Sequence, residues 1–380
     1  MTASILAAAQ APYTRHASPT TTTPQVIAEA VRRALSQAGL TPQDVDGFGI
    51  SSFTLQPDHA VDLAWRMGLR LSWLMEDTNG GASAGGMLQH AVRAIEAGDA
   101  SVVVLAAGDV MDRDAFTRLV ARYNRATEQH LTPLPMPGPN AVFAMLTRRQ
   151  MGALGLERAD YGRIAVAQRQ WAADNPGAVY RSPLGLDEYL GAPMVADPLG
   201  RYDCVPTVTG ADAVVVAADD RLGGRRRAKV LAVTTSYNSD DQTGDGLTTG
   251  LRACAPLAWE RSGVSPAETG VASVYDDYPA MVVAQLMDMG FIEDGADVSR
   301  YIDSWISSRK LPLNTSGGQL SAGQAGAAGG MHGLVEVATQ LLHRAGDRQV
   351  DARFGVVSGY GMVLYRYGAC ATMTVLEGVA

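Results

Sequence analysis

Cysteine, aromatic side chains and charge are all scarce in this sequence. Its three cysteines, Cys204, Cys254 and Cys370, are odd in number and far apart, so they predict neither a disulfide framework nor a paired-cysteine metal site. The formal net charge is −8. This balance argues against nucleic acid as a partner, because binding to phosphates requires a basic face.

Long apolar runs are also missing. No stretch of 18 consecutive apolar residues occurs, which argues against a membrane-spanning segment. The N-terminus has no basic region ahead of its short apolar run, and Pro12 ends that run early, so we expect a first strand and not a signal peptide. Together these absences predict a cytoplasmic protein that binds no membrane, no nucleic acid and no metal.

Helical and strand patterns alternate at short spacing. Apolar residues three and four apart predict a helix over 24–38, and short apolar runs predict strands over 4–8, 47–51 and 101–107. Alternation of this kind is typical of a largely parallel sheet with helices on its faces. The sequence therefore predicts an α/β fold.

Two short segments recur in the same order along the chain. Residues 38–42 (Ala-Gly-Leu-Thr-Pro) are echoed at 262–266 (Ser-Gly-Val-Ser-Pro), and Ala-Gly-Gly-Met occurs at both 84–87 and 328–331. Each Ala-Gly-Gly-Met opens a helical pattern that is followed by an apolar strand. Two echoes in one order indicate an internal duplication.

The duplication divides the chain into two halves, 1–225 and 226–380. Residues 112–203 have no counterpart in the second half, so we interpret them as an insertion that caps a site or contributes to an interface. A glycine-rich turn that leads into a helix directs backbone amides toward a ligand. Two such turns facing each other would build one site with two oxyanion-binding walls. Close packing of helices at the centre of the fold is the alternative explanation for these glycines.

Several motifs together give the sequence a family resemblance. It resembles the thiolase superfamily, and more narrowly its sterol-carrier-type, thiolase-like branch. The resemblance implies duplicated βαβαβαββ halves, each with a five-stranded sheet, in a five-layered αβαβα arrangement. It also implies a homodimer, a coenzyme A thioester as substrate and no tightly bound cofactor. The motifs that carry it are 196–199 (Ala-Asp-Pro-Leu), 203–206 (Asp-Cys-Val-Pro), 210–213 (Gly-Ala-Asp-Ala), 314–318 (Asn-Thr-Ser-Gly-Gly) and 322–326 (Ala-Gly-Gln-Ala-Gly).

The chain departs from this family at the catalytic positions. Gly81 stands where thiolases place a nucleophilic cysteine, and without a thiolate the ordinary acyl-enzyme route is lost. Ser83 could replace the cysteine if the register shifts by two residues, although a structural helix-capping serine is the favoured interpretation. Gln324 replaces the histidine of the family's Gly-His-Pro motif. Its amide can still donate a hydrogen bond to an enolate oxygen.

Tyrosines occupy two further positions of the family's site. Residues 275–278 (Tyr-Asp-Asp-Tyr) stand at the Asn-Glu-Ala-Phe motif, and Tyr360 stands in the last glycine-rich loop. This set is similar to that of the steroid side-chain aldolases of the branch. We expect Tyr360 to exchange a proton, with Tyr275 and Asp276 assisting, while Gln324 stabilises an enolate. The residues expected to bind substrate are Gly81, Ser83, Ser316, Gly317, Gly318 and Gly361.

The resemblance favours a lyase that cleaves a bulky β-hydroxyacyl-CoA by retro-aldol chemistry, without an acyl-cysteine intermediate. Two alternatives stay open. One is a thiolase-like acyltransferase or β-ketothiolase that acts on an unusual acyl-CoA, and the other is a non-catalytic subunit that binds acyl-CoA. The resemblance also implies a small partner protein with an OB-fold and a zinc ribbon, giving an α2β2 assembly. The three scattered cysteines could not hold that zinc.

Overall fold

The computed structural model describes residues 3–134, 138–219, 224–239, 244–364 and 367–380. Nine strands form one mixed sheet in the order β3-β2-β4-β7-β1-β8-β11-β10-β9. The strands β1 and β8 are joined through two residue pairs, Ser4 with Lys229 and Ile5 with Ala228, so the sheet divides there into two half-sheets. The strand bounds are β1 Ala3–Gln10, β2 Gly47–Ser51, β3 Trp73–Glu76, β4 Val102–Asp109, β7 Gly210–Ala218, β8 Arg227–Tyr237, β9 Val271–Ser273, β10 Phe354–Leu364 and β11 Tyr367–Val379.

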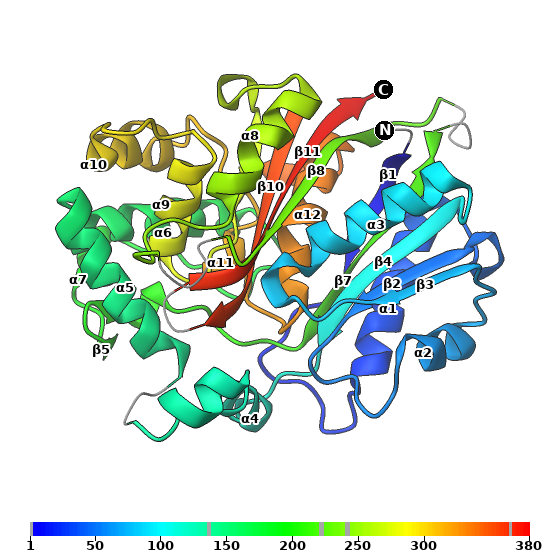
Figure 1. The fold of residues 1–380 in the computed structure, drawn as a ribbon, viewed down its shortest axis with the longest axis horizontal. Helices are drawn as coiled ribbons and strands as arrows, with labels where there is room; N and C mark the ends of the chain where they lie inside the picture. Colours follow the sequence, from blue (N-terminus) through cyan, green and yellow to red (C-terminus); the bar gives the residue numbers. More distant parts are fainter. Residues whose placement is uncertain (1–2, 135–137, 220–223, 240–243, 365–366) are drawn as a thin grey trace.

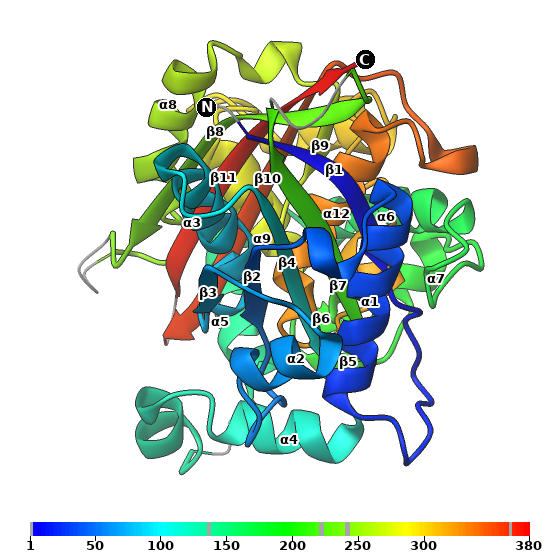
Figure 2. The same ribbon diagram turned by 90° about the vertical axis from the view of Figure 1, so that its right-hand side faces the viewer.

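Helices cover both half-sheets and separate them. The helices α1 and α2 pack on the outer face of the first half-sheet, α3 and α12 lie between the half-sheets, and α8 and α9 cover the second (Figures 1 and 2). This is the expected αβαβα order of layers. The helix bounds are α1 Thr23–Ala38, α2 Ala60–Met67, α3 Ser83–Ala97, α4 Arg113–Ala121, α5 Pro139–Leu154, α6 Arg158–Ala173, α7 Leu186–Leu190, α8 Leu251–Ser262, α9 Pro279–Asp288, α10 Val298–Tyr301, α11 Gly318–Ala322 and α12 Ala328–Leu341.

The echoed segments adopt the same local structure in both halves. Gly39 and Gly263 each end a helix with a φ of 66°, a left-handed conformation that suits glycine. A short 3₁₀ turn follows each of them, at Pro42–Asp44 and at Pro266–Glu268. The predicted helix over 24–38 and the strands over 4–8, 47–51 and 101–107 are likewise confirmed as α1, β1, β2 and β4. The boundary between residues 225 and 226 stays a prediction.

The second half-sheet is smaller than the resemblance implied. Where a fifth strand was expected, Leu313 forms an isolated bridge with Ala272 of β9 within the described part of the chain. The second half-sheet therefore consists of β8, β11, β10 and β9, with this parallel bridge in the place of the fifth strand.

The unmatched segment 112–203 folds mainly against the second half. Helices α5, α6 and α7 lie on the side of α9 and α10, whereas α4 stands apart below the sheet (Figure 1). Apolar side chains of α6, among them Tyr161 and Ile164, share one buried cluster with α8, α9 and β11. Two short strands, β5 Met194–Ala196 and β6 Leu199–Gly200, pair with each other near its end. No helix in the described ranges is long and apolar enough to cross a membrane.

Candidate active site

A cavity of about 450 Å³ lies between the glycine-rich turns and the inserted segment. Its polar floor is built by Tyr275, Asp277 and Gln324, and its walls are mainly apolar side chains. Asp277 is the one charged residue in the lining that the structure describes. The cavity therefore has one polar end, formed by Tyr275, Asp277 and Gln324 and called the reactive corner below. The rest of the cavity suits an uncharged, apolar group. Its wall residues include Phe53, Met111, Phe116, Leu119, Val120, Leu131, Val142, Phe143 and Val363.

Gly81 lies in the tight turn that precedes α3 and lines this cavity. A Cβ at this position would lie 2.4 Å from Cε2 of Tyr275 and 2.2 Å from the carbonyl oxygen of Tyr360. Real side chains do not approach so closely, so only glycine fits here. The ring of Tyr275 thus occupies the space that a cysteine side chain at position 81 would need.

Tyr275, Asp277 and Gln324 form a closed hydrogen-bonded group. The Tyr275 hydroxyl donates to Oδ2 of Asp277 over 3.1 Å, and Nε2 of Gln324 donates to the Tyr275 hydroxyl over 3.1 Å and to Oδ1 of Asp277 over 2.6 Å. Both amide protons of Gln324 are therefore engaged. In this arrangement Gln324 orients the tyrosine and the carboxylate, and the predicted bond from its amide to an enolate would require one of these contacts to open.

The electrostatics of this group suit proton transfer near neutral pH. Burial, which outweighs the hydrogen bond from Tyr275, raises the pKa of Asp277 to about 7, and the neighbouring charge of Asp276 adds to the effect. Burial and the charge of Asp277 also raise the pKa of Tyr275 well above its ordinary value. A carboxyl with a pKa close to neutrality is matched to general acid–base catalysis. Asp277 was not among the residues predicted from the sequence.

The loop that carries Gln324 is held from both halves of the chain. Its backbone pairs with the segment before β7: the backbone N–H of Gln324 donates to the Pro206 carbonyl over 2.9 Å. The amide of Ala327 donates to Oδ2 of buried Asp109 over 2.7 Å. The other oxygen of Asp109 accepts bonds from the backbone amides of Phe53 and Thr54. One carboxylate therefore fixes loops of the first and the second half together.

A second tyrosine, Tyr123, reaches the reactive corner from the inserted segment. It lines the cavity, and its hydroxyl lies 3.2 Å from the position that a Cβ on Gly80 would take. Burial, followed by the charge of Asp277, raises its pKa well above the ordinary value, so the phenol keeps its proton at neutral pH. The insertion has no counterpart in the second half, and no sequence signal singled out this residue.

Asp276 points away from Tyr275 and serves the backbone of α11. Its carboxylate accepts bonds from the amides of Gln319 over 2.9 Å and Leu320 over 3.3 Å. A Cβ on Gly318 would lie 2.1 Å from this carboxylate, which explains glycine at that position. The expectation that Asp276 stands behind Tyr275 is corrected: Asp277 takes that place. Gly317 precedes α11 and Gly318 is its first residue, and neither of them lines the cavity.

Tyr360 lies in strand β10, so its predicted place in a loop is wrong. Its side chain is buried, and its hydroxyl accepts a hydrogen bond from the amide of Gly368 on the neighbouring strand. It does not line the cavity. Gly361 follows it and packs on the first glycine-rich turn, where a Cβ would lie 2.0 Å from the carbonyl oxygen of Asn79. Both residues support the turn from behind.

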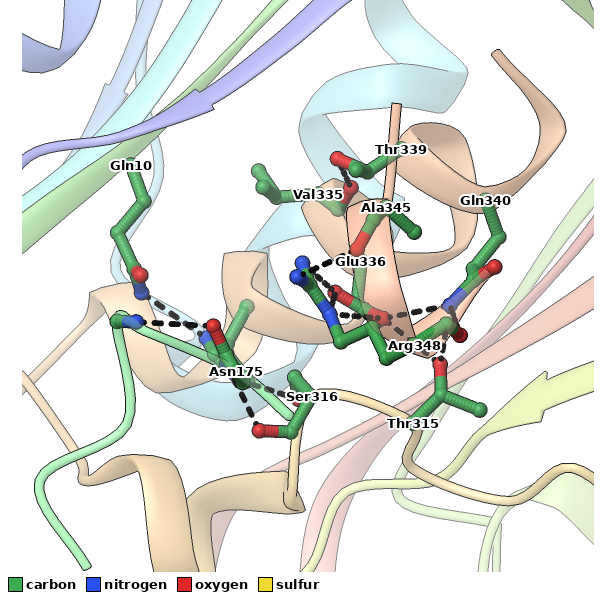
Figure 3. Close-up of polar contacts among 12 residues, drawn as sticks. Gln10, Asn175, Thr315, Ser316, Val335, Glu336, Thr339, Gln340, Ala345 and Arg348 are labelled. Carbon is green, nitrogen blue, oxygen red and sulfur yellow. Dashed lines mark hydrogen bonds and ion pairs between the residues drawn. The ribbon is translucent and has the colours of Figure 1, made fainter. Parts of the chain in front are cut away.

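The two predicted serines are buried outside the cavity. Ser83 opens α3, and its hydroxyl accepts a bond from Ser51 over 3.1 Å without capping the helix. Ser316 lies in a buried polar network (Figure 3), where its carbonyl accepts a bond from Asn175 over 2.8 Å. Its hydroxyl lies 2.8 Å from Nε2 of His332. Of the six predicted substrate-binding residues, the cavity lining contains Gly81.

None of the three cysteines supplies the missing nucleophile. Burial is the main cause that raises the pKa of Cys204 to about 12 and those of Cys254 and Cys370 to about 11, so all three thiols are protonated at neutral pH. Cys370 comes nearest to the glycine-rich turn, where its thiol donates to the side chain of Asn79 over 3.6 Å. The described residues contain no group of three or more histidine, cysteine or acidic side chains that could hold a metal ion.

Comparisons with known proteins show the family to which the chain belongs. Residues 232–375 match the thiolase C-terminal domain-like family. A 17-hydroxy-3-oxo-4-pregnene-20-carboxyl-CoA lyase of Mycobacterium tuberculosis is 32% identical over 339 residues, which cover 83% of this chain and 86% of the relative. The chain belongs to the thiolase superfamily, in its sterol-carrier-type thiolase-like branch.

Further members of this thiolase-like branch share the chain's length and fold. A steroid side-chain-cleaving aldolase of Thermomonospora curvata is 30% identical, with 82% of this chain and 83% of the relative covered. The solved structure of an Ltp2-ChsH2(DUF35) aldolase superposes with a TM-score of 0.83 at 25% identity, over 99% of this chain and 98% of that one. The α/β thiolase fold expected from the sequence is thereby confirmed.

Proposed function

We propose that this thiolase-like protein is a lyase that cleaves the carbon–carbon bond of a bulky β-hydroxyacyl-CoA by retro-aldol chemistry. The observation that carries the proposal is the Tyr275 ring in the space of the lost cysteine, bonded to a carboxylate whose pKa is about 7. Such a site lacks a nucleophile but holds a proton acceptor beside a phenol. The relatives named as a lyase and an aldolase support the same reaction class.

The reaction requires a base for the β-hydroxyl and an acid for the enolate. We assign the first role to Tyr275 with Asp277: the phenol oxygen takes the hydroxyl proton while its own proton moves to the carboxylate. The Cα–Cβ bond breaks, its electron pair moves to the thioester enolate, and the β-carbon becomes a carbonyl. We assign the second role to Tyr123, the second phenol in the cavity lining: it donates its proton to Cα and regains one from solvent. Gln324 keeps Tyr275 and Asp277 aligned.

The cavity also bears on the acyl group. About 450 Å³ of mainly apolar space suits a rigid polycyclic group better than a short chain. One relative is named as a steroid side-chain-cleaving aldolase and another as a lyase of a pregnene-20-carboxyl-CoA. We therefore propose a steroid-like acyl group, carried as its coenzyme A thioester and bound under α4 and α5.

The proposal is tested by cleavage without added coenzyme A. Purified protein incubated with a β-hydroxyacyl-CoA of polycyclic type is expected to release a ketone or aldehyde and a shorter acyl-CoA, because retro-aldol cleavage consumes no thiol. Intact-mass spectrometry of the protein during turnover should show no acyl adduct. An adduct, or a strict requirement for free coenzyme A, would instead support the acyltransferase alternative.

Cleavage should depend on pH through Asp277. Because the ionised carboxylate is the proton acceptor and its pKa is about 7, kcat/KM is expected to fall by about tenfold per pH unit well below 7 and to level off above it. Asp277→Asn should abolish this dependence along with most of the rate. The stability effect has the opposite sign: a raised carboxyl pKa favours the folded chain most below about pH 4, and this contribution declines as the pH rises to 7. A rate that stays flat from pH 5.5 to 7.5, a range of about two units around that pKa, would contradict the assignment.

We further propose a homodimer that joins the β3 edges of two copies. β3 ends the sheet, and apolar side chains stand exposed beside it: Leu74 is 41% exposed, and Trp65 of α2 is 81% exposed. Unpaired edge strands with exposed apolar groups are ordinarily covered. Light scattering is expected to give twice the chain mass, and Leu74→Lys should shift the protein toward a monomer.

A small second protein completes the proposed assembly. The matched solved structure is of an Ltp2-ChsH2(DUF35) aldolase, whose name joins Ltp2 with a second protein. We propose a partner with an OB-fold and a zinc ribbon, which would give an α2β2 complex. Co-expression with such a protein from the same genome should yield a stable complex in pull-down. A cleavage rate that does not change when such a protein is added, together with no complex in pull-down, would remove the proposal.

A further inference from the structure

A second pocket lies on the other side of the segment that backs Gln324. It has a volume of about 260 Å³ and shares Thr207 with the wall of the acyl cavity. Thr207 also pairs with Gln324 in a short parallel bridge. This pocket is therefore separate from the acyl cavity, and the backbone segment around Thr207 lies between the pocket and the reactive corner.

Three arginines and two tyrosines alternate along the pocket. The guanidinium of Arg169 lies over the rings of both Tyr180 and Tyr202, at 5.2 and 5.7 Å from the ring centroids. Arg15 lies over Tyr180 at 5.6 Å, and Arg201 lies over Tyr202 at 5.9 Å. The rings hold the three cations in place by cation–π contacts, which leave the hydrogen-bonding edges of Arg15 and Arg201 for other groups.

The positive charge of this pocket is only partly offset by the protein: the charge of Glu188 acts on Arg169 but forms no ion pair with it in the described part of the chain. Within the described ranges, none of Arg15, Arg169 and Arg201 has a carboxylate within 4.0 Å. The buried Arg169 donates from Nε to the hydroxyl of Ser321 over 2.9 Å and from Nη1 to the carbonyl of Ser182 over 3.3 Å, both of them neutral acceptors. Glu188 is the nearby acid, and it accepts a bond from the hydroxyl of Tyr202 instead. A buried cation without a counter-charge is costly unless a ligand supplies one.

We infer that this pocket binds the phosphate or diphosphate group of an organic phosphate. Guanidinium groups recognise phosphate oxygens through paired, charge-assisted hydrogen bonds, and three of them converge here. The natural source is the phosphorylated end of the coenzyme A thioester, an assignment that rests on the proposed function. A free nucleotide or phosphate that binds independently of the substrate has the same chemistry.

The test measures binding, so it does not depend on the lyase reaction. Arg15 and Arg201 are exposed, and the double variant Arg15→Gln/Arg201→Gln should fold normally. Calorimetric titrations use coenzyme A, adenosine 3′,5′-bisphosphate, inorganic diphosphate and pantetheine, which has the thiol arm without phosphates. Each arginine lost should weaken binding of the phosphorylated ligands by about tenfold at low salt, and pantetheine binding should not change. Arg261→Gln, on the exposed end of α8, is the charge-matched control.

The results of these titrations distinguish the two possible ligands of the pocket, the coenzyme A thioester and a free phosphate compound. Weakened binding of both coenzyme A and diphosphate supports the site with the substrate as its ligand. Weakened binding of diphosphate alone supports the site for a free phosphate ligand. Equal affinity of the double variant and the control for all the phosphorylated ligands overturns the inference. A protein that binds coenzyme A in this way but does not cleave β-hydroxyacyl-CoA would refute the proposed function and leave the pocket assignment standing.

Discussion

Replacing Tyr275 with phenylalanine is expected to lower the rate of cleavage by about 10²- to 10⁴-fold, the usual range for loss of general acid–base help. The substitution keeps the ring that fills the space beside Gly81 and removes the hydroxyl that joins Asp277 and Gln324. Folding should therefore be preserved, and the loss should appear in kcat more than in KM. Steady-state kinetics together with a thermal unfolding curve measure both.

Tyr360→Phe is the matched control for this variant. It also removes one buried phenolic oxygen, but that oxygen accepts a bond from the Gly368 amide and lies outside the cavity lining. We expect a loss of about 1–3 kcal/mol in the free energy of unfolding, because a buried N–H is left without its acceptor. Turnover should change by less than about tenfold. If Tyr360→Phe were the inactive variant and Tyr275→Phe stayed active, proton exchange would return to Tyr360 as the sequence suggested.

Restoring the family's cysteine should inactivate this protein. A side chain on residue 81 would have to displace the ring of Tyr275, whose nearest atom lies 2.4 Å from the Cβ position, or move the β10 backbone at Tyr360. We expect Gly81→Cys to lower the free energy of unfolding by about 1–3 kcal/mol, the usual cost of overpacking. Cleavage should fall by about 10²-fold or more, because Tyr275 loses its position against Asp277.

The control for crowding is Gly152→Cys. A Cβ on Gly152, in α5, meets no atom within 4 Å, so this variant adds the same thiol without a clash. It should retain the rate and stability of the parent chain. Thiolytic activity gained by Gly81→Cys would show that the site tolerates both side chains and would contradict the account of why the cysteine is missing.

The sequence predicted the reactive corner only in part, and the reason is geometric. Gln324 and Tyr275 were placed at family positions on two different loops, and the structure brings them together. Asp276 and Asp277 are adjacent in the irregular segment between β9 and α9, yet their carboxylates bond to different partners: Asp276 to the backbone of α11, and Asp277 to Tyr275 and Gln324. The sequence could not tell which one faces Tyr275. Tyr123 comes from an insertion without an internal repeat, so no pattern related it to the site.

Tyr360 shows a different limit of sequence reasoning. Glycines on both sides of it suggested a loop, yet Gly359 and Gly361 are required because β10 packs against the Gly81 turn. Gly368 of the neighbouring β11 is required because it packs against the Tyr360 ring. Small residues in a strand and in a loop give the same local pattern. Only the three-dimensional packing distinguishes them, whereas the overall α/β fold followed from spacing and repetition alone.

The shared carboxylate of Asp109 bears on the history of the duplication. Each half repeats the same strand–helix unit, yet Asp109 of the first half accepts a backbone bond from Ala327 of the second. The central helices α3 and α12 contribute to one core cluster that contains residues of both halves. An isolated half would leave this carboxylate or its donors unsatisfied and half of that core in water. The two copies have thus lost the autonomy of their ancestral unit, and the chain is expected to unfold in a single cooperative transition.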